Sequence, residues 1–390
     1  MTRCRRWPLH PAPIDGEALS SWLRRIADCY GTGIEGLGAD IGYNLAESNV
    51  ADIIDLVPAP AMIAILAERT GITPVRIRQM SVAGWTPWLL DDMDYHADGF
   101  ETYARQLSVL RPAGKHKTHQ VSSWRPWLSD RMPARACPEC VTVGPFSQSY
   151  QLLWAIPIVS TCPLHQCWLA ETIGARGYYG IWGFDRPIPR PAPEQILALD
   201  QRTRDAFRIG HVDLPHRRVH AGIWFRLLRA IVDELSCPIS ESRPSTATVI
   251  RQVWKEAGYL VRDGQGQWCP YEQQSTTVQQ HSMEAAATTV ALLENGSITG
   301  PGKDAHLFQP APHIAANDGT PPTTRHASRF GGGLSLMEAF NEAVGEARIN
   351  PAAARNLFNL STYKRNDADR IHDVVNSFID LGIPLDFLSH

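Results

Sequence analysis

Apolar positions recur at helical spacing along most of this chain, and this pattern predicts a mainly α-helical protein. The first such stretch begins after Asp15 and carries its polar Arg24 and Arg25 on the opposite face. Its apolar face comprises Ala18, Leu19, Trp22, Leu23 and Ile26. A second strong stripe comprises Ile223, Trp224, Leu227, Leu228, Ile231, Val232 and Leu235. Strand-like alternation is scarce outside residues 151–160, so little β-sheet is expected.

Residues 61–81 predict two helices joined by a tight turn. The first helix is expected to end near Gly71, after which Thr73 offers an N-cap and Pro74 suits the first helical position. The second helix, residues 74–81, would expose three polar side chains suited to DNA bases, as the recognition helix of a helix-turn-helix does. These are Arg76, Arg78 and Gln79. The alternative is that the pair simply packs within a helical domain.

Changes in composition divide the chain into five predicted regions. Residues 1–100 form an N-terminal helical region with the helix-turn-helix-like pair, and 101–175 form a zinc-binding module with a basic stretch. A helical domain follows at 176–294. Residues 295–333 contain seven Gly and five Pro and are predicted to be a linker. The last region, 334–390, again has helical spacing.

The charge of the chain as a whole gives no reason to expect a nucleic-acid surface, since the formal net charge is −3. Residues 103–136, however, hold seven Lys or Arg against one acid, Asp130, a local charge of +6. Lys115 and Lys117 are therefore candidates for contact with DNA phosphates, with Trp124 and Trp127 interleaved for stacking. The alternative is a solvated loop whose tryptophans belong to a core.

Two features of the sequence bear on its location. No apolar run approaches the ~20 residues needed to cross a bilayer, and no apolar stretch follows the basic residues 1–6 as in a secretory signal. Eight cysteines in 390 residues do not form a disulfide scaffold. We therefore expect a cytoplasmic protein without a membrane partner.

The strongest chemical pattern is a pair of short cysteine-containing turns. Cys137-Pro-Glu-Cys140 is followed after 21 residues by Cys162-Pro-Leu-His165. Each turn presents two of the four sulfur and nitrogen ligands that a tetrahedral Zn²⁺ requires, and a site with four protein ligands is structural rather than catalytic. Buried free thiols are the alternative, and Cys167 is a rival for the fourth position. A redox-active CxxC fits less well because the βαβ context is missing.

No pattern of an enzyme was found. The chain lacks a phosphate-binding GxxxxGK[ST], a GxSxG elbow and an HExxH. The acidic run at 91–94 is interpreted as a solvated turn, and the histidines at 116, 119, 211, 216 and 220 as surface residues. We therefore expect neither catalytic residues nor a cofactor other than zinc.

Two motifs together resemble the TniQ family. Residues 11–27, PAPIDGEALSSWLRRIA, are similar to the family's opening P-x-P-x-x-G-E-S-L-x-S-W-L-x-R-x-A, with Ala18 in place of the usual Ser. The Cys-Pro-x-Cys and Cys-Pro-x-His pairs match its zinc-binding turns in the same order. The resemblance covers residues 8–172.

Membership of this family, which includes the TnsD proteins, implies selection of the target site for a transposon. Cys137, Cys140, Cys162 and His165 would then bind zinc, and the partners would be DNA, an AAA+ ATPase regulator and the transposase of the same element. In some members the partner is a CRISPR RNA-guided complex. A helix-turn-helix transcriptional regulator with a structural zinc module is the alternative function, and a nuclease is a weaker one.

Overall fold

The structure, a computed structural model, divides into two compact units, residues 1–313 and 314–390. The first is described at 6–45, 50–96, 98–112, 124–129, 132–142, 149–172, 186–215, 217–262, 264 and 269–309. The second is described at 344, 347–348, 350, 353–355, 357–358, 368–383 and 385. Each unit is treated by itself below.

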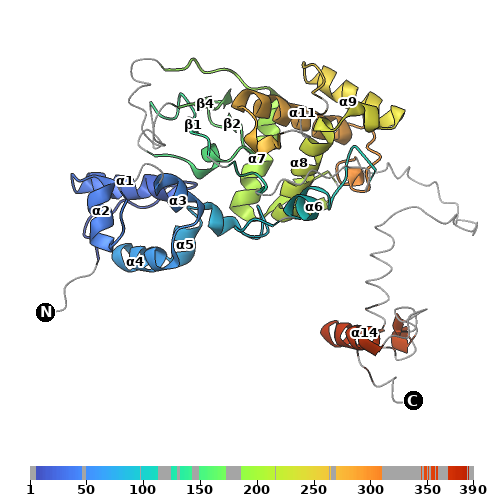
Figure 1. Cartoon of the computed structure of the whole chain (residues 1–390), viewed down its shortest axis with the longest axis horizontal. Coiled ribbons are helices and arrows are strands. Elements are labelled where there is room, and N and C mark those ends of the chain that lie inside the picture. The colour runs from blue at the N-terminus through green and yellow to red at the C-terminus, as the bar shows by residue number, and fades with distance from the viewer. Residues whose placement is uncertain are drawn as a thin grey trace, which may run out of the picture. The chain divides into compact units, whose positions relative to one another are not determined.

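Five short helices at the N-terminus of the first unit surround an apolar core (Figure 1). They are α1 (Leu19–Cys29), α2 (Ile34–Ile41), α3 (Val50–Leu56), α4 (Pro60–Thr70) and α5 (Pro74–Arg78). The predicted apolar face of α1 is confirmed, since Trp22, Leu23 and Ile26 are fully buried. The backbone N–H of Leu19 donates to Met80 O (2.9 Å), which ties the start of α1 to the chain just after α5.

The turn between α4 and α5 forms as its residues predict. Gly71 ends α4 with φ of 76°, a left-handed conformation that glycine adopts without steric cost. Thr73 caps α5 by accepting a hydrogen bond from the N–H of Arg76 (3.3 Å), and Pro74 takes the first position. The second helix, however, ends at Arg78 and not at Ser81. The chain turns there because Met80 is buried and Ser81 N–H bonds back to Arg78 O.

The middle of the first unit contains short elements around a small β structure. They are η1 (Val82–Trp85), α6 (Gly99–Ala104), β1 (Arg135–Ala136), η2 (Leu152–Ala155), β2 (Thr161–Cys162), β3 (Cys167–Trp168) and β4 (Ala170–Glu171). β1 pairs antiparallel with β4, and β2 with β3. The β1–β4 pair brings residues 135–136 next to residues 170–171, and the β2–β3 pair forms a hairpin within residues 161–168.

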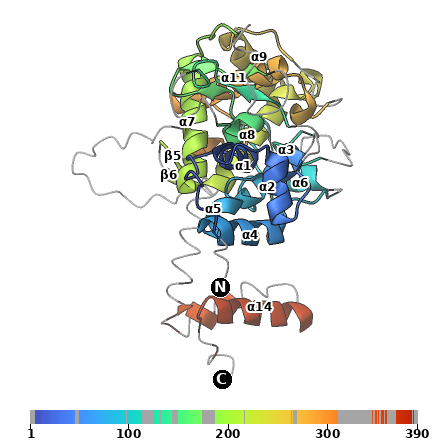
Figure 2. The same ribbon diagram turned by 90° about the vertical axis from the view of Figure 1, so that its left-hand side faces the viewer.

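A helical bundle completes the first unit. Its elements are α7 (Glu194–Ile209), β5 (His211–Leu214), β6 (Arg217–His220), α8 (Ala221–Ser236), η4 (Ile239–Glu241), α9 (Pro244–Glu256), η5 (Tyr271–Gln273), α11 (Thr276–Glu294) and η6 (Ala305–Leu307). The α11 helix packs against α7, α8 and α9, and the β5–β6 hairpin lies beside α7 and α8 (Figure 2). Trp224, Leu228 and Leu235 of α8 are fully buried, as expected for the predicted apolar stripe.

Residues 295–309, which fall in the predicted linker, pack on this bundle. Ile298 and Phe308 are buried, and the backbone at Gly302 lies against Ser108 and Val109. A Cβ at Gly302 would come within 2.3 Å of Ser108 O, so only glycine fits this approach. Residues 310–333 of the linker prediction lie outside the described residues. The finer region boundaries at 100, 175 and 294 stay predictions.

The second unit contains α14 (Ala368–Asp380) and a small apolar cluster of its own. In that cluster Phe358 and Phe378 meet edge to face, with ring centroids 5.6 Å apart. Phe378 lies on α14, within the last region, for which helical spacing was predicted.

The predicted fold class is confirmed in its coarse form. Helices dominate the described residues, which contain three two-stranded sheets and no larger one. The identification of the α4–α5 pair as a DNA-binding helix-turn-helix stays a prediction, as does the zinc ribbon. Within the described part of the chain, no helix combines the length and apolar character that crossing a membrane requires.

Candidate metal centre

Two tight turns place four ligand-type side chains around one point. Cys137 directly follows β1, and Cys140 lies one turn later. Cys162 ends β2, and His165 belongs to the turn that leads into β3. This turn is closed by Gln166 in a left-handed conformation, with φ of 50°. Cys137, Cys140 and Cys162 are buried, whereas His165 is exposed.

The distances in this cluster suit a tetrahedral ion. All four ligand atoms lie within 4.8 Å of one another. His165 Nδ1 is 3.4 Å from Cys137 Sγ, 3.2 Å from Cys140 Sγ and 3.7 Å from Cys162 Sγ. Cys140 Sγ is 3.6 Å from Cys162 Sγ. Bond lengths of ~2.3 Å to sulfur and ~2.0 Å to nitrogen give tetrahedral edges of about 3.5–3.8 Å. The cluster could therefore hold a metal ion among its four side chains.

Cys167 lies beside this cluster but outside the group of four. Its Sγ is buried 3.6 Å from Cys137 Sγ, and its Cα pairs with that of Cys162 across the β2–β3 hairpin. The set whose atoms are all mutually close contains His165 instead. The geometry therefore favours His165 as the fourth ligand.

The thiols around Cys137 favour its thiolate form. Hydrogen bonds from the thiols of Cys140, Cys162 and Cys167 lower the pKa of Cys137. The thiolate is the form that binds metal. A group of thiols this close thus favours an anionic sulfur even before a cation is considered.

Two buried charged residues fix the backbone that carries the ligands. Asp200, on α7, accepts hydrogen bonds from the N–H groups of Ser160 and Thr161 (2.9 and 2.7 Å) and from the Thr161 hydroxyl. Arg135, two residues before Cys137, donates to the carbonyls of Trp154, Ile156 and Val159. No pattern of neighbouring residues along the chain indicates either role.

Asp200 predicts a pH dependence of stability. Burial raises its pKa to about 6, with hydrogen bonds from Thr161 and Ser160 acting against this. Because the folded pKa lies above the usual ~3.9, this residue's contribution to stability is complete below pH ~4 and is lost as pH rises through about 6. In denaturant titrations we expect the parent to lose up to about 3 kcal/mol relative to Asp200→Asn between pH 4 and 7.5.

Both proteins in that comparison carry the same Cys and His cluster, so proton-linked metal loss cancels in the difference between them. A difference between parent and Asp200→Asn that stays constant over this pH range would contradict the prediction.

The two tryptophans of the basic stretch are core residues. Trp127 is fully buried and Trp124 is 4% exposed. Trp124 Nε1 and the backbone N–H of Trp127 both donate to the Glu272 carboxylate, at 2.9 and 3.0 Å. Arg229 Nε donates to the same carboxylate at 2.9 Å. The two tryptophans therefore pack in the core, as the alternative interpretation had it, and the prediction that they stack on bases is wrong.

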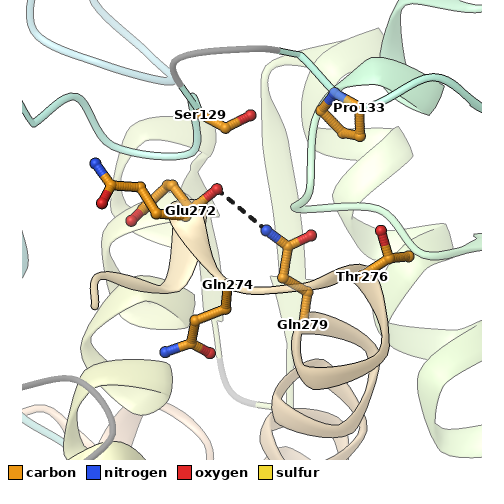
Figure 3. A pocket seen from close by; sticks show the side chains of 7 residues that line it. Ser129, Pro133, Glu272, Gln274, Thr276 and Gln279 are labelled. Atoms are coloured by element: carbon orange, nitrogen blue, oxygen red, sulfur yellow. Dashed lines mark hydrogen bonds between the residues drawn. The ribbon is translucent and has the colours of Figure 1, made fainter. Parts of the chain in front are cut away.

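A polar pocket of about 290 Å³ lies beside Glu272 (Figure 3). Ser129, Thr276 and Gln279 are among its lining residues. Gln279 Nε2 donates to the backbone carbonyl of Glu272 at 3.2 Å, drawn as a dashed line in Figure 3. Since the Glu272 carboxylate already accepts from two tryptophans and an arginine, it holds the bundle together and is not free for chemistry.

The basic stretch contributes less surface charge than its sequence suggests. Arg111 and Arg135 are buried, Arg105 pairs with Glu101 (2.8 Å), and Arg125 lies over the ring of Tyr95. Lys115 and Lys117, the two candidate phosphate contacts, lie outside the described residues. Their role stays a prediction.

The three polar residues at α5 are placed at the surface. Arg76 is half-buried and forms an ion pair with Asp15, while Arg78 and Gln79 are exposed. Arg78 Nε donates to Ala83 O at 3.2 Å. These contacts leave the side chain of Gln79 and part of the Arg76 guanidinium open to a ligand. Whether they contact DNA stays a prediction.

The remaining histidines and acids do not form a second metal site in the part of the chain that the structure describes. His211 Nδ1 bonds to Ile209 O, and His220 caps α8 through the Gly222 N–H. Asp92 bonds to Asp94 N–H and to His96 within a turn, as interpreted from the sequence. His116, His119 and His216 lie outside the described residues.

The N-terminal motif joins directly onto residues 150–152, which lie between the two cysteine-containing turns. Ala18 N–H donates to Tyr150 O and Leu152 N–H donates to Gly16 O, both at 2.9 Å. Gly16 has φ of 75°, and a Cβ there would come within 2.6 Å of Gln151 Oε1. Glu17 accepts hydrogen bonds from the Ile14 N–H, the Ser21 hydroxyl and Arg25. The Gly-Glu of the motif is therefore needed for this junction.

Comparison with known proteins gives one result for this chain. The model of the TniQ family matches residues 8–169. No curated protein and no solved structure matches. The matched range begins just before the N-terminal motif and ends after both cysteine-containing turns, so the four clustered side chains all fall inside it. The resemblance predicted from the two motifs is confirmed: residues 8–169 of this chain are a TniQ-family domain.

Proposed function

We propose that this protein is a zinc-containing DNA-binding adaptor that selects the target site for transposon insertion. The observation that carries the proposal is the TniQ match over 8–169 with an intact cluster of three cysteines and one histidine inside it. A TniQ domain implies a role associated with transposition, and a metal bound by the cluster would stabilise the fold of that domain.

The metal is proposed to be Zn²⁺ with a structural role. Three thiolates and one imidazole at tetrahedral edge lengths are the donors that Zn²⁺ prefers, and four protein ligands leave no position for water. When bound, the ion joins the 137–140 turn to the 162–165 turn and stabilises the fold. The protein is accordingly proposed to have no catalytic activity of its own.

The adaptor role requires two kinds of partner. One is DNA at the target site, contacted directly or through a CRISPR RNA-guided complex. The other is an AAA+ ATPase regulator that brings the transposase of the same element. Footprinting of DNA with and without the ATPase encoded beside this gene tests both. Protection of a defined site that extends when the ATPase is added is the expected result, and metal-dependent cleavage of the DNA would refute the adaptor role.

Substitutions in α5 test whether the protein recognises the base sequence of its target DNA. Arg suits bidentate contact with guanine and Gln with adenine, each worth roughly 1–3 kcal/mol of discrimination. We expect Arg76→Ala to weaken binding to the target about 5- to 150-fold while changing binding to random duplex far less. Affinities for both duplexes, measured by fluorescence anisotropy, give the ratio.

Asp15→Ala is the matched control, because it removes the same surface ion pair and leaves the guanidinium in place. An exposed pair of this kind contributes at most ~1 kcal/mol to stability. Arg76→Ala that melts like the control yet keeps the parent's ratio of target to random affinity would exclude a recognition role for α5.

A further inference from the structure

A second polar pocket lies at the N-terminus of α9, remote from the metal centre. It encloses about 220 Å³, and its lining residues include Arg111, Ser240, Glu241, Ser242, Arg243 and Thr246, of which Glu241 and Arg243 are exposed. In Figures 1 and 2, α9 lies at the opposite end of the first unit from α4 and α5. The pocket is therefore separate from the α5 surface.

The end of α9 supplies backbone donors to this pocket. The helix has 13 residues, begins with Pro244 and has no side-chain cap on its N-cap residue, Arg243. The N–H of Ala247 is the first to bond within the helix, to Arg243 O. The preceding N–H groups, of Ser245 and Thr246, are the ones that a helix leaves without an internal partner. Together with the helix dipole they favour an anion.

Thr246 gives an independent reason to expect a ligand here. Its side chain is 2% exposed, and its Oγ1 has no hydrogen-bond partner among the described residues. A buried hydroxyl without a partner is destabilising, because it has lost its hydrogen bonds to water and gained none in return. Most threonines in helices avoid this cost by bonding to the carbonyl four residues earlier, as Thr248 does with Pro244 O (2.9 Å). Thr246 instead lines the pocket.

The charge around the pocket is positive on its outer side. Arg243 is exposed, and no ion pair of Arg243 is found in the described ranges. A neighbouring groove of about 660 Å³ shares Ser240 and Ser242 and continues along α9 to Thr248 and Arg251. Lys255 lies one turn beyond Arg251 on the same exposed face.

The second arginine of the pocket, Arg111, is buried. It hydrogen-bonds the thiol of Cys237. Glu241 also lines the pocket and opposes an anion, but it is exposed and so well screened.

We propose that this pocket binds a phosphate group of the DNA backbone, and that Arg251 and Lys255 follow the strand along α9. A helix N-terminus, hydroxyls and guanidinium groups around one pocket offer the donors that a tetrahedral oxyanion accepts. Arg251 and Lys255, one turn apart and both exposed, extend the positive charge along α9, which fits a polymer of phosphates and exceeds the needs of a single ion. The inference rests on the proposed function, since it names a second place where the adaptor contacts DNA.

The test uses the full-length, zinc-loaded protein and a 30-base-pair duplex in a salt series. Arg243→Gln should reduce the slope of log K against log salt by about one and weaken binding equally on target and random sequences. Thr246→Val should weaken binding about three- to tenfold with an unchanged slope. The same valine variant should melt no lower than the parent, because it removes an unpaired buried hydroxyl. A purely structural threonine would lower the melting temperature.

Arg208→Gln is the control for charge, since Arg208 is an exposed arginine at the end of α7 that pairs only locally with Asp205. If the parent binds DNA and Arg243→Gln has the same slope and affinity as Arg208→Gln, the pocket inference is wrong and the proposed function stands. Parent protein that binds no duplex even at low salt overturns direct DNA contact and the inference together. A third outcome is that 10 mM inorganic phosphate raises the melting temperature of the parent but not of Arg243→Gln, while both bind the duplex equally. The pocket would then bind free phosphate, and the proposal that it binds a DNA phosphate would be wrong.

Discussion

Cys140→Ser is expected to release the metal and to unfold the chain around residues 132–172. Zinc in small domains contributes an apparent binding free energy of roughly 10–16 kcal/mol at neutral pH, and that energy is folding energy. Here the ion would join the 137–140 turn to the 162–165 turn, which the two-residue β1–β4 pair and the hydrogen bonds of Arg135 also hold near each other. Metal analysis should give one zinc per parent chain and none in the variant. Limited proteolysis should cut the variant within this region.

Cys29→Ser is the control, because Cys29 is an exposed free cysteine on α1. It should retain one zinc and the parent's protease resistance. Two further variants decide the fourth ligand: His165→Ala should lose the metal, and Cys167→Ser should keep it. The opposite pattern would assign Cys167 to the site, and full zinc content in Cys140→Ser would refute the proposed ligand set.

Glu272→Ala is expected to have the second largest effect, a loss of about 3–5 kcal/mol in the free energy of unfolding. The substitution leaves Arg229, which is 2% exposed, without the carboxylate that it contacts at 2.9 Å. It also removes the acceptor for Trp124 Nε1 and for the N–H of Trp127. Arg229 would thus lose its nearer carboxylate and keep only the more distant Asp233, at 3.9 Å, while two buried donors would lose their acceptor. Denaturant titration of the holoprotein measures the loss.

Glu294→Ala on α11 is the matched control. Glu294 also pairs with an arginine, Arg202, at 2.6 Å, but both side chains are partly exposed. Removing such a pair costs at most ~1 kcal/mol. If Glu272→Ala and Glu294→Ala lowered the free energy of unfolding equally, burial of the Glu272 network would add nothing to stability.

Local features of the fold could be predicted because short patterns determine them. The apolar face of α1, the Gly71 turn and the Thr73 cap depend on residues within a few positions of one another. The four clustered metal-ligand candidates were also predictable, since each turn carries its two side chains at fixed spacing.

Contacts over long separations could not be predicted from one sequence. Nothing near Glu272 indicates that it accepts from Trp124, 148 residues away, and nothing near Asp200 shows that it anchors Thr161. The surface charge of residues 103–136, whose formal charge is +6, could not be predicted for the same reason. Its formal charge says nothing of Arg135 being buried among three carbonyls, because burial depends on the rest of the fold.

The junction between the N-terminal motif and residues 149–152 has a consequence for synthesis. Tyr150 N–H donates to Ser21 Oγ across 129 residues, and Gly16 and Ala18 bond to the same segment. The first helix is therefore synthesised well before residues 149–152. At 5–20 residues per second the delay is roughly 6–26 seconds. The apolar face of α1 shares its core with residues of α2–α5, all of which are made earlier, so we expect α1–α5 to assemble before the two cysteine-containing turns are complete.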